Sequence, residues 1–349
     1  MPTTARDHSS PLTVGFIGAG FMATVHSRAA RASRARLLAI SAGSPGTAER
    51  TARELGIERA EATGAAVIDA VDLVHVVTPN ASHVEYALAA LAAGRHVICE
   101  KPLATTAADA QRLVDAAEAA GVVAAVPFVY RYHPMVREAR ARIASGRSGR
   151  VLSIQGSYLQ DWLALDSDDD WRVDAAIGGA SRAFADIGSH LCDLVEFVTG
   201  DRIVRLAATT RTYFAERAGR RPVDTEDAAA LVIETVGGAI GTLLVSQAAP
   251  GRKNRLALEI AGSAESIGFD QENPETLWLG RRTGSRQLLR DGADLSPDAA
   301  RLSVLPAGHP LGYQDAFTAF VTDVYDAARG GRPEGLPTFA DGLRAAQLT

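Results

Sequence analysis

The chain has 349 residues, of which 47% are hydrophobic and 22% are charged. These values are typical of a globular protein with room for two packed domains. The 36 basic and 41 acidic residues give a net charge of −5, which excludes the broad positive surface needed to bind nucleic acid or an anionic membrane. We therefore expect a small-molecule partner, with no nucleic acid and no membrane.

Cysteine usage and the N-terminal residues indicate the compartment. Cys99 and Cys192 are the two cysteines of the chain, and two are too few to indicate a disulfide framework. The first twelve residues are polar and lack the apolar stretch of a signal peptide. No apolar run reaches the roughly 18 residues of a membrane span. These features together predict a cytoplasmic protein with reduced thiols.

Short apolar runs alternate with alanine-rich helical stretches from residue 12 to about residue 126. This alternation predicts βαβ units around a parallel sheet, because unbroken apolar runs are typical of strands covered on both faces. The expected strands are residues 12–17, 36–41, 71–77, 96–99 and 122–126, and the expected helices are residues 21–33, 45–55, 82–93 and 106–119. We assign residues 1–126 to one doubly wound domain.

The pattern changes after residue 150. Strand-like segments joined by glycine or polar turns predict an open, mostly antiparallel sheet. The expected strands are residues 151–159, 203–213, 228–235, 239–247, 255–262 and 276–280, with helices at residues 181–198 and 313–329. Residues 281–312 carry no clear pattern. The predicted fold class is therefore α/β, with a parallel doubly wound sheet followed by an α+β domain over residues 127–349.

A glycine-rich stretch, GFIGAGFMA, follows the first predicted strand and opens the first predicted helix. Gly18, Gly20 and Ala23 match the pattern G-x-G-x-x-[G/A] of dinucleotide-binding loops. The first glycine permits a tight turn, the second lets the backbone approach a pyrophosphate, and the small third residue packs helix against strand. We expect Phe21 and Met22 to lie beside the phosphates at the helix N-terminus.

The residues after the second predicted strand bear on the choice between NAD and NADP. The loop motif expects an acid about 20 residues further on, which binds the ribose 2′-hydroxyl. Here the strand ends in Ser41-Ala42-Gly43-Ser44, without a carboxylate. No arginine follows at once, although Arg50 lies on the next predicted helix. The sequence leaves both cofactors open with a preference for NAD, and makes Ser41 a candidate cofactor contact.

Further motifs follow later strands. They are Thr78-Pro79-Asn80 with His83, Glu100-Lys101-Pro102, and GGASRAFADIGSHLCD over residues 178–193. With the glycine loop, this set resembles the Gfo/Idh/MocA oxidoreductase family from about residue 12 to the C-terminus. The resemblance implies an N-terminal Rossmann domain that binds NAD(P). It also implies a C-terminal domain whose open sheet forms oligomer contacts, so we expect a homodimer or homotetramer. Members of the family usually carry a further helix and strand after a segment like residues 338–347. We therefore expect this chain to differ from them at its C-terminal edge.

The resemblance also implies roles for single residues. Lys101, Asp186 and His190 match the family's catalytic residues, and Asp193 matches a substrate-binding acid of inositol dehydrogenase-like members. Candidate cofactor contacts are Gly18, Gly20, Phe21, Met22, Ser41, Thr78, Pro79, Asn80, His83, Glu100, Lys101, Arg131 and Trp171; candidate substrate contacts are Lys101, Arg131, Tyr158, Asp186, His190 and Asp193. The stretches from Tyr158 to Arg172 and from Gly251 to Asn254 are similar to members of the levoglucosan dehydrogenase type, which act at C3 of a pyranose.

These residue types suit the oxidation of an alcohol, which needs a base for the hydroxyl proton and an acceptor for the hydride. Asp186, His190 and Asp193 are spaced i, i+4 and i+7, which places them on one face of an ideal helix. Histidine can exchange the proton near neutral pH, and an ammonium group can stabilise a developing alkoxide. We expect Lys101 and His190 to form an acid–base pair, with Asp186 positioning the imidazole and Asp193 holding a substrate hydroxyl.

The preferred interpretation is an NAD(P)-dependent dehydrogenase that oxidises a secondary hydroxyl of a sugar, anhydrosugar or cyclic polyol to a ketone, or runs the reverse reaction. Two alternatives remain open. A redox-assisted glycosidase would use tightly held NAD, and a non-catalytic NAD(P)-binding regulator would keep the glycine loop without the lysine and histidine. No metal is expected, because the chain has neither an H-E-x-x-H motif nor cysteine-rich spacing.

Overall fold

The computed structural model describes residues 11–218, 221–291 and 293–349. Residues 1–10, on which the prediction of no signal peptide largely depends, lie outside the described residues. The chain forms two compact units: Met1–Pro127 with Phe317–Leu343, and Phe128–Ala316 with Arg344–Thr349. Among the described residues, no helix is both long and apolar enough to cross a membrane.

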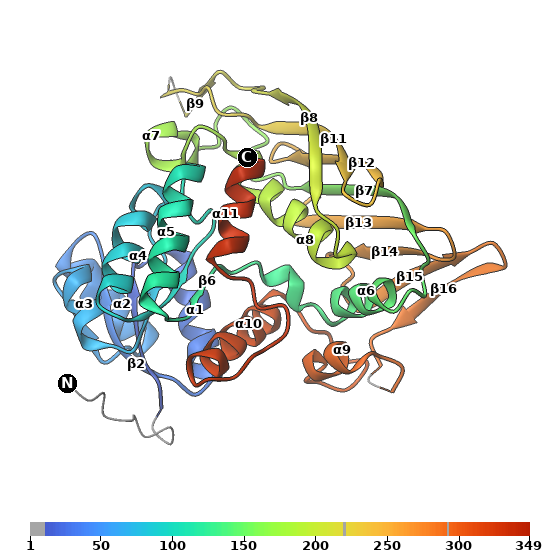
Figure 1. Cartoon of the computed structure of the whole chain (residues 1–349). Coiled ribbons are helices and arrows are strands. Elements are labelled where there is room, and N and C mark those ends of the chain that lie inside the picture. The colour runs from blue at the N-terminus through green and yellow to red at the C-terminus, as the bar shows by residue number, and fades with distance from the viewer. Residues whose placement is uncertain (1–10, 219–220, 292) are drawn as a thin grey trace. The chain divides into compact units, whose positions relative to one another are not determined.

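The first unit is built on parallel strands in the order β3-β2-β1-β4-β5-β6. This is the strand order of a doubly wound nucleotide-binding sheet, as predicted. Its elements, blue to blue-green in Figure 1, are β1 (Thr13–Ile17), α1 (Phe21–Ala32), β2 (Arg36–Ser41), α2 (Pro45–Leu55), β3 (Arg59–Ala60), α3 (Gly64–Ala70), β4 (Leu73–Val76), η1 (Asn80–Ser82), α4 (His83–Ala92), β5 (His96–Cys99), α5 (Ala107–Ala120) and β6 (Ala124–Ala125).

Local sequence signals account for most of these elements. β4 is buried at every position, and its residues other than His75 are aliphatic, as expected for a strand covered on both faces. Ser44 caps the N-terminus of α2 by accepting a hydrogen bond from the Thr47 amide (3.3 Å), and Gly56 ends that helix at a φ of 60°. The predicted bounds of β2, β5 and α2 are confirmed. The sequence did not predict β3 and α3, because two and seven residues are too few for a periodic signal.

The second unit is built on eight strands in the order β16-β15-β14-β13-β7-β12-β11-β8. Neighbours are antiparallel except β7 and β12, so the sheet is mixed and mostly antiparallel, which confirms the predicted fold class. From Phe128 onward the elements are η2 (Val129–Tyr132), α6 (Pro134–Ala144), β7 (Val151–Leu159), η3 (Trp171–Val173), α7 (Ala175–Gly178), η4 (Phe184–Gly188), α8 (Ser189–Thr199), β8 (Ile203–Arg211), β9 (Glu216–Arg217), β10 (Arg221–Pro222), β11 (Ala228–Thr235), β12 (Ile240–Ser246), β13 (Arg255–Gly262), β14 (Ser266–Asp270), β15 (Thr276–Arg281), β16 (Gly284–Leu289), α9 (Pro297–Leu302), α10 (Tyr313–Ala328) and α11 (Phe339–Leu348).

The chain returns to the first unit near its end. Phe317–Leu343 packs with the nucleotide-binding sheet, whereas the sequence analysis placed it in the domain of residues 127–349. The Val126 amide donates to the Pro337 carbonyl oxygen (3.2 Å), and α10 contributes Phe320 to the buried core. The sequence pattern does not reveal which of the two sheets α10 packs on, because an amphipathic helix has the same pattern in either case.

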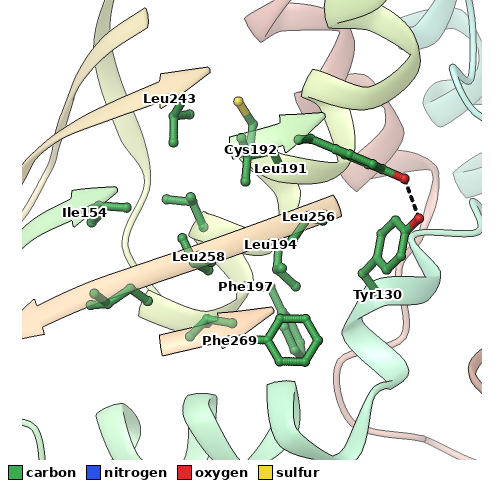
Figure 2. Close-up of a cluster of buried hydrophobic side chains, with 14 of the residues drawn as sticks. Tyr130, Ile154, Leu191, Cys192, Leu194, Phe197, Leu243, Leu256, Leu258 and Phe269 are labelled. Carbon is green, nitrogen blue, oxygen red and sulfur yellow. Dashed lines mark hydrogen bonds between the residues drawn. The ribbon is translucent and has the colours of Figure 1, made fainter. Parts of the chain in front are cut away.

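One face of the eight-stranded sheet is covered by α6 and α8, which also contact each other (Figure 1). Figure 2 shows the buried cluster beneath them, with Leu191, Leu194 and Phe197 from α8 and with Ile154, Leu243, Leu256, Leu258 and Phe269 from the strands. A Cβ atom on Gly156 would lie 2.8 Å from a methyl group of Leu243, so a larger residue there would force that side chain to shift. Apolar packing therefore fixes the helix that carries His190.

The predicted helix over residues 181–198 has a different form. Phe184–Gly188 is a π turn (η4), and the α-helix begins only at Ser189. A π turn holds more residues than an α turn. The spacing argument for Asp186, His190 and Asp193 assumed an ideal α-helix, so it does not apply across this segment. The unassigned residues 281–312 contain β16 and α9.

Candidate active site

The glycine loop leaves β1 at the carboxyl edge of the parallel sheet. Gly18 has a φ of 114°, and a Cβ atom there would lie 2.6 Å from the Val77 carbonyl oxygen, so no other residue fits. A Cβ atom on Gly20 would meet nothing within 4 Å, and the neighbouring Phe21 is exposed. The buried Ala23 packs α1 onto the sheet. This turn leaves open space at the N-terminus of α1, where backbone amides can bind a diphosphate, so the residues fit a dinucleotide.

The end of β2 lies beside this loop, because the Gly18 amide donates to the Ser41 carbonyl oxygen (2.9 Å). The Ser41 side chain is buried, and the Ser44 hydroxyl caps α2. Neither a carboxylate nor an arginine lies between these two serines. This turn therefore supplies neither the acid that binds a ribose hydroxyl nor the cation that binds a 2′-phosphate.

The loop after β4 carries Thr78, Pro79 and Asn80, and is tied to the loop after β5 by His83. His83 is fully buried, with Nδ1 2.8 Å from the Pro102 carbonyl oxygen and Nε2 2.9 Å from the Thr78 carbonyl oxygen. Burial lowers the pKa of His83, although both carbonyl groups act to raise it. The imidazole thus connects two loops of the predicted cofactor site through their backbones.

Glu100 and Lys101 follow β5, and the Lys101–Pro102 peptide bond is cis. The Glu100 carboxylate is buried; Oε1 lies 2.9 Å from His26 Nε2, and Oε2 accepts the Lys101 amide (3.1 Å). Burial alone would raise the pKa of Glu100, but the His26 hydrogen bond and the positive charge of Lys101 hold it below its ordinary value. Lys101 therefore emerges from the sheet next to a buried carboxylate.

Asp186 lies in the π turn of the second unit and is held by two side chains. Gln247 Nε2 donates to Asp186 Oδ2 (2.7 Å), and Arg172 Nε lies 3.7 Å from Oδ1. The Arg172 guanidinium also stacks on Trp171, 4.2 Å from its ring centroid. Sequence reasoning did not find Gln247, which is wholly buried. The sequence feature that could have identified Gln247 is its place as a glutamine at the end of the largely apolar predicted strand 239–247.

His190 lies among aromatic rings. Its own ring centroid is 5.0 Å from that of Tyr130, 5.6 Å from that of Phe128 and 6.4 Å from that of Tyr158. Burial raises the pKa of both tyrosines, and the nearby Asp186 carboxylate raises it further. The two tyrosines therefore lie near Asp186 and His190, two of the three predicted catalytic residues.

A hydrogen-bonded group lies beside His190. The Tyr130 and Tyr158 hydroxyl groups bond to each other, and Tyr158 also donates to Asn254 Oδ1 (2.7 Å). Asn254 Nδ2 in turn donates to the Tyr130 hydroxyl (3.1 Å), and the Gln160 amide donates to Asn254 Oδ1 (2.8 Å). This network fixes the phenol groups around the imidazole. Tyr158, a predicted substrate contact, thus lies next to His190.

Asp193 and Arg131 form a buried ion pair. Arg131 Nε donates to Asp193 Oδ2 (2.8 Å), and Arg131 NH2 bonds to Oδ1. The guanidinium also stacks on Phe197, 4.8 Å from its ring centroid. Both oxygens of the predicted substrate-binding acid are therefore bonded by Arg131, itself a predicted cofactor and substrate contact.

Two family models match the chain. The model described as oxidoreductase family, NAD-binding Rossmann fold, matches residues 12–128, and the GFO/IDH/MocA C-terminal domain model matches residues 136–268. The levoglucosan dehydrogenase of Pseudarthrobacter phenanthrenivorans is 33% identical, over 97% of this chain and 94% of the relative.

Solved structures agree with this match. A levoglucosan dehydrogenase in complex with NADH and L-sorbose has a TM-score of 0.91 at 32% identity, covering 97% of this chain and 94% of that one. An oxidoreductase domain protein from Kribbella flavida has a TM-score of 0.90 at 36% identity, covering 97% of this chain and 95% of that one.

The fold and the glycine loop define the class: the protein is an oxidoreductase with an NAD(P)-binding Rossmann domain. The chain belongs to the Gfo/Idh/MocA family.

The Arg131–Asp193 pair generates a stability prediction. Replacing Asp193 by Asn leaves a buried guanidinium without its carboxylate, so we expect the free energy of unfolding to fall by about 3–5 kcal/mol. As a control, Asp161→Asn removes a pair with the exposed Lys253 and should change it by about 1 kcal/mol or less. Urea unfolding measures both. Unchanged stability of Asp193→Asn, with a raised KM for the sugar, would instead make Asp193 a substrate contact alone.

Proposed function

We propose that the protein uses NAD to oxidise a secondary ring hydroxyl of a sugar, an anhydrosugar or a cyclic polyol to a ketone. The single observation that carries the proposal is the dinucleotide loop of the first unit, which lies at the same sheet edge as Lys101. The second unit supplies Asp186 and His190 as the further candidate catalytic residues. The levoglucosan dehydrogenase relative, with its complex of NADH and a sugar, supports this substrate class. The Tyr130–Tyr158 pair offers hydroxyl groups of the kind that bind sugar hydroxyls.

The chemistry divides among three side chains. NAD, when bound, accepts the hydride from the carbinol carbon. The Lys101 ammonium stabilises the negative charge that develops on the hydroxyl oxygen, and His190 exchanges the proton of that hydroxyl. Asp186 orients the imidazole. Its own orientation follows from Gln247 and Arg172, which bind both carboxylate oxygens.

The preference for NAD is supported by the turn after β2. A 2′-phosphate held by an arginine gains a charge-assisted hydrogen bond worth about 1.5–3 kcal/mol. The residues from Ser41 to Ser44 contain no arginine to make that bond, and the levoglucosan dehydrogenase complex contains NADH.

Assembly is a separate part of the proposal. Val232 of β11, Leu244 of β12 and Trp278 of β15 are exposed and line one shallow hollow on the eight-stranded sheet. An apolar surface of this kind on a sheet is typical of an interface. We propose that two copies pack through this face to form a homodimer, or a homotetramer built from such dimers.

A substrate screen tests the activity. Purified protein is offered NAD or NADP with pyranoses, anhydrosugars and inositols, and reduced cofactor is followed by its absorbance. We expect at least one of these compounds to be oxidised. The kcat/KM for NAD should exceed that for NADP about tenfold or more, because the turn after β2 has no arginine to bind the 2′-phosphate of NADP. Release of sugar from a nitrophenyl glycoside without net cofactor reduction would favour a glycosidase, and a preference for NADP would contradict the cofactor assignment.

Variants of the two central residues test the mechanism. Lys101→Ala and His190→Ala should each lower kcat by about 10²–10⁴-fold, because each removes a group that acts on the hydroxyl. NADH affinity, measured by fluorescence, should change little in His190→Ala. The control is Lys253→Ala, which removes the one other lysine of the sequence and breaks an exposed pair with Asp161. Wild-type turnover in both Lys101→Ala and His190→Ala would refute the assignment.

Light scattering after gel filtration tests the assembly. The wild-type mass should be two or four times 36.6 kDa. Leu244→Glu combined with Val232→Glu should release monomers, since two carboxylates would be buried without partners in the interface. Leu165→Glu, at an exposed leucine outside the sheet, is the control that should leave the mass unchanged. A monomeric wild-type protein would contradict the proposal.

A further inference from the structure

Three polar aromatic side chains lie in series behind Glu100 in the first unit. They are His26 of α1, His75 of β4 and Tyr325 of α10, and all are buried. The Tyr325 hydroxyl lies 2.8 Å from His75 Nε2, and His75 Nδ1 lies 2.8 Å from His26 Nδ1. His26 Nε2 then reaches Glu100 at 2.9 Å, and Glu100 accepts the Lys101 amide. We call His26, His75 and Tyr325 the buried histidine chain.

With a neutral His26 ring, the proton count gives this series one direction. An ionised Glu100 only accepts hydrogen bonds, so His26 Nε2 carries a hydrogen and, in neutral His26, Nδ1 is an acceptor. His75 must then donate from Nδ1 and accept at Nε2, which leaves the Tyr325 hydroxyl as the donor at the far end. Burial lowers the pKa of His75 well below 6.5, which favours a neutral ring that donates from one nitrogen and accepts at the other. Each contact in the series thus holds one hydrogen.

His75 is a polar residue in the middle of an apolar, fully buried strand. The other residues of β4 are aliphatic, and the His75 ring stacks on Phe16 with a centroid distance of 4.9 Å. His26 packs edge-on to Phe317, at 4.6 Å. An aliphatic residue in the middle of a buried strand avoids the desolvation of a polar ring. Local exceptions of this kind concentrate at functional sites.

The charge of Glu100 depends on this series. The groups that face Glu100 are His26 from α1, His83 from α4, and its neighbours Cys99 and Lys101. Burial acts to raise the pKa of Glu100, and the His26 hydrogen bond is the first influence that lowers it. Without a donor at position 26, the pKa of Glu100 must rise, so a proton would bind to the carboxyl group at a higher pH.

We propose that His26, His75 and Tyr325 are positioning residues for the Lys101 site, because they keep Glu100 ionised and fixed against the Lys101 amide. This inference rests on the proposed function of Lys101. All three side chains are buried behind Glu100. The series acts on the reaction only through Glu100, at the end of the strand that presents the lysine.

The pH dependence of turnover tests the proposal with a pair of variants at one position. His26→Leu removes the donor to Glu100, whereas His26→Gln keeps an N–H group that can reach it. We expect His26→Leu to lower kcat at neutral pH about tenfold and to move the acid limb of the profile up by about one pH unit or more, with the sugar KM nearly unchanged. His26→Gln should restore the wild-type limb.

A single-atom change at the other end of the series provides a second test. Tyr325→Phe removes one hydroxyl group and should move the acid limb in the same direction by a smaller amount. Tyr86→Phe makes the same chemical change on α4, outside the series, and should leave the profile unchanged. If His26→Leu does not fold, the comparison of Tyr325→Phe with Tyr86→Phe decides, and identical profiles for the two overturn the proposal.

Infrared spectroscopy separates this proposal from the role of Lys101. The band of the protonated Glu100 carboxyl group, assigned by its loss in Glu100→Gln, should appear at higher pH in His26→Leu than in the wild type. Appearance at the same pH in both overturns the positioning role, whatever the kinetics. If the band shifts but Lys101→Ala remains fully active, the series controls Glu100 as inferred, and the proposed function of Lys101 is what fails.

Discussion

Backbone hydrogen bonds past the ends of the parallel strands are the constraint on which the nucleotide-binding half depends. The Gly18 amide bonds to Ser41, the Val77 amide to Ile17 and the Glu100 amide to Val76, each at 2.9 Å. These bonds extend the ladder by one residue into each loop. Because all strands run the same way, the loops leave from the same edge. The candidate cofactor residues of the first unit lie at the end of β2, in the loops that leave this edge or at the start of the helices that follow them.

A different constraint organises the second unit, where buried charges need partners. Asp227 is fully buried and receives hydrogen bonds from two buried guanidinium groups, those of Arg182 and Arg217. Arg182 also donates to Gln247 Oε1 (3.2 Å), while Gln247 Nε2 donates to Asp186. Removing one partner of such a network leaves an uncompensated charge. The orientation of Asp186 is therefore coupled to ion pairs that lie well inside the unit.

Much of the fold could be predicted because burial dictates periodicity. β7, β11 and β13 have their predicted bounds, since alternating or continuous apolar residues identify them directly. β14 and β16 were not predicted, because one is interrupted by glycine and the other is largely exposed and polar. α6 was not predicted either, since its arginines are buried in pairs with residues far along the chain, such as Arg142 with Glu265.

For the site, the sequence predicted residue types better than partners. Lys101 and the histidine of α8 were singled out by the motifs that contain them and by the family resemblance of those motifs. The bonds of Arg131 to Asp193 and of His75 to Tyr325 were not, because they join residues 62 and 250 positions apart. Such pairs depend on how the chain folds back on itself, and the spacing of residues within a single sequence does not contain that information.

The π turn at Phe184–Gly188 has a consequence for the evolution of this site. A π turn is an α-helix that has gained a single residue, so its geometry is set by the number of residues in the segment as much as by their identity. Deleting one position before Ser189 would convert the turn to regular helix and rotate Asp186 by about 100° away from Gln247. Insertions and deletions, rather than substitutions, are thus the changes that would turn the Asp186 carboxylate toward Gln247 or away from it.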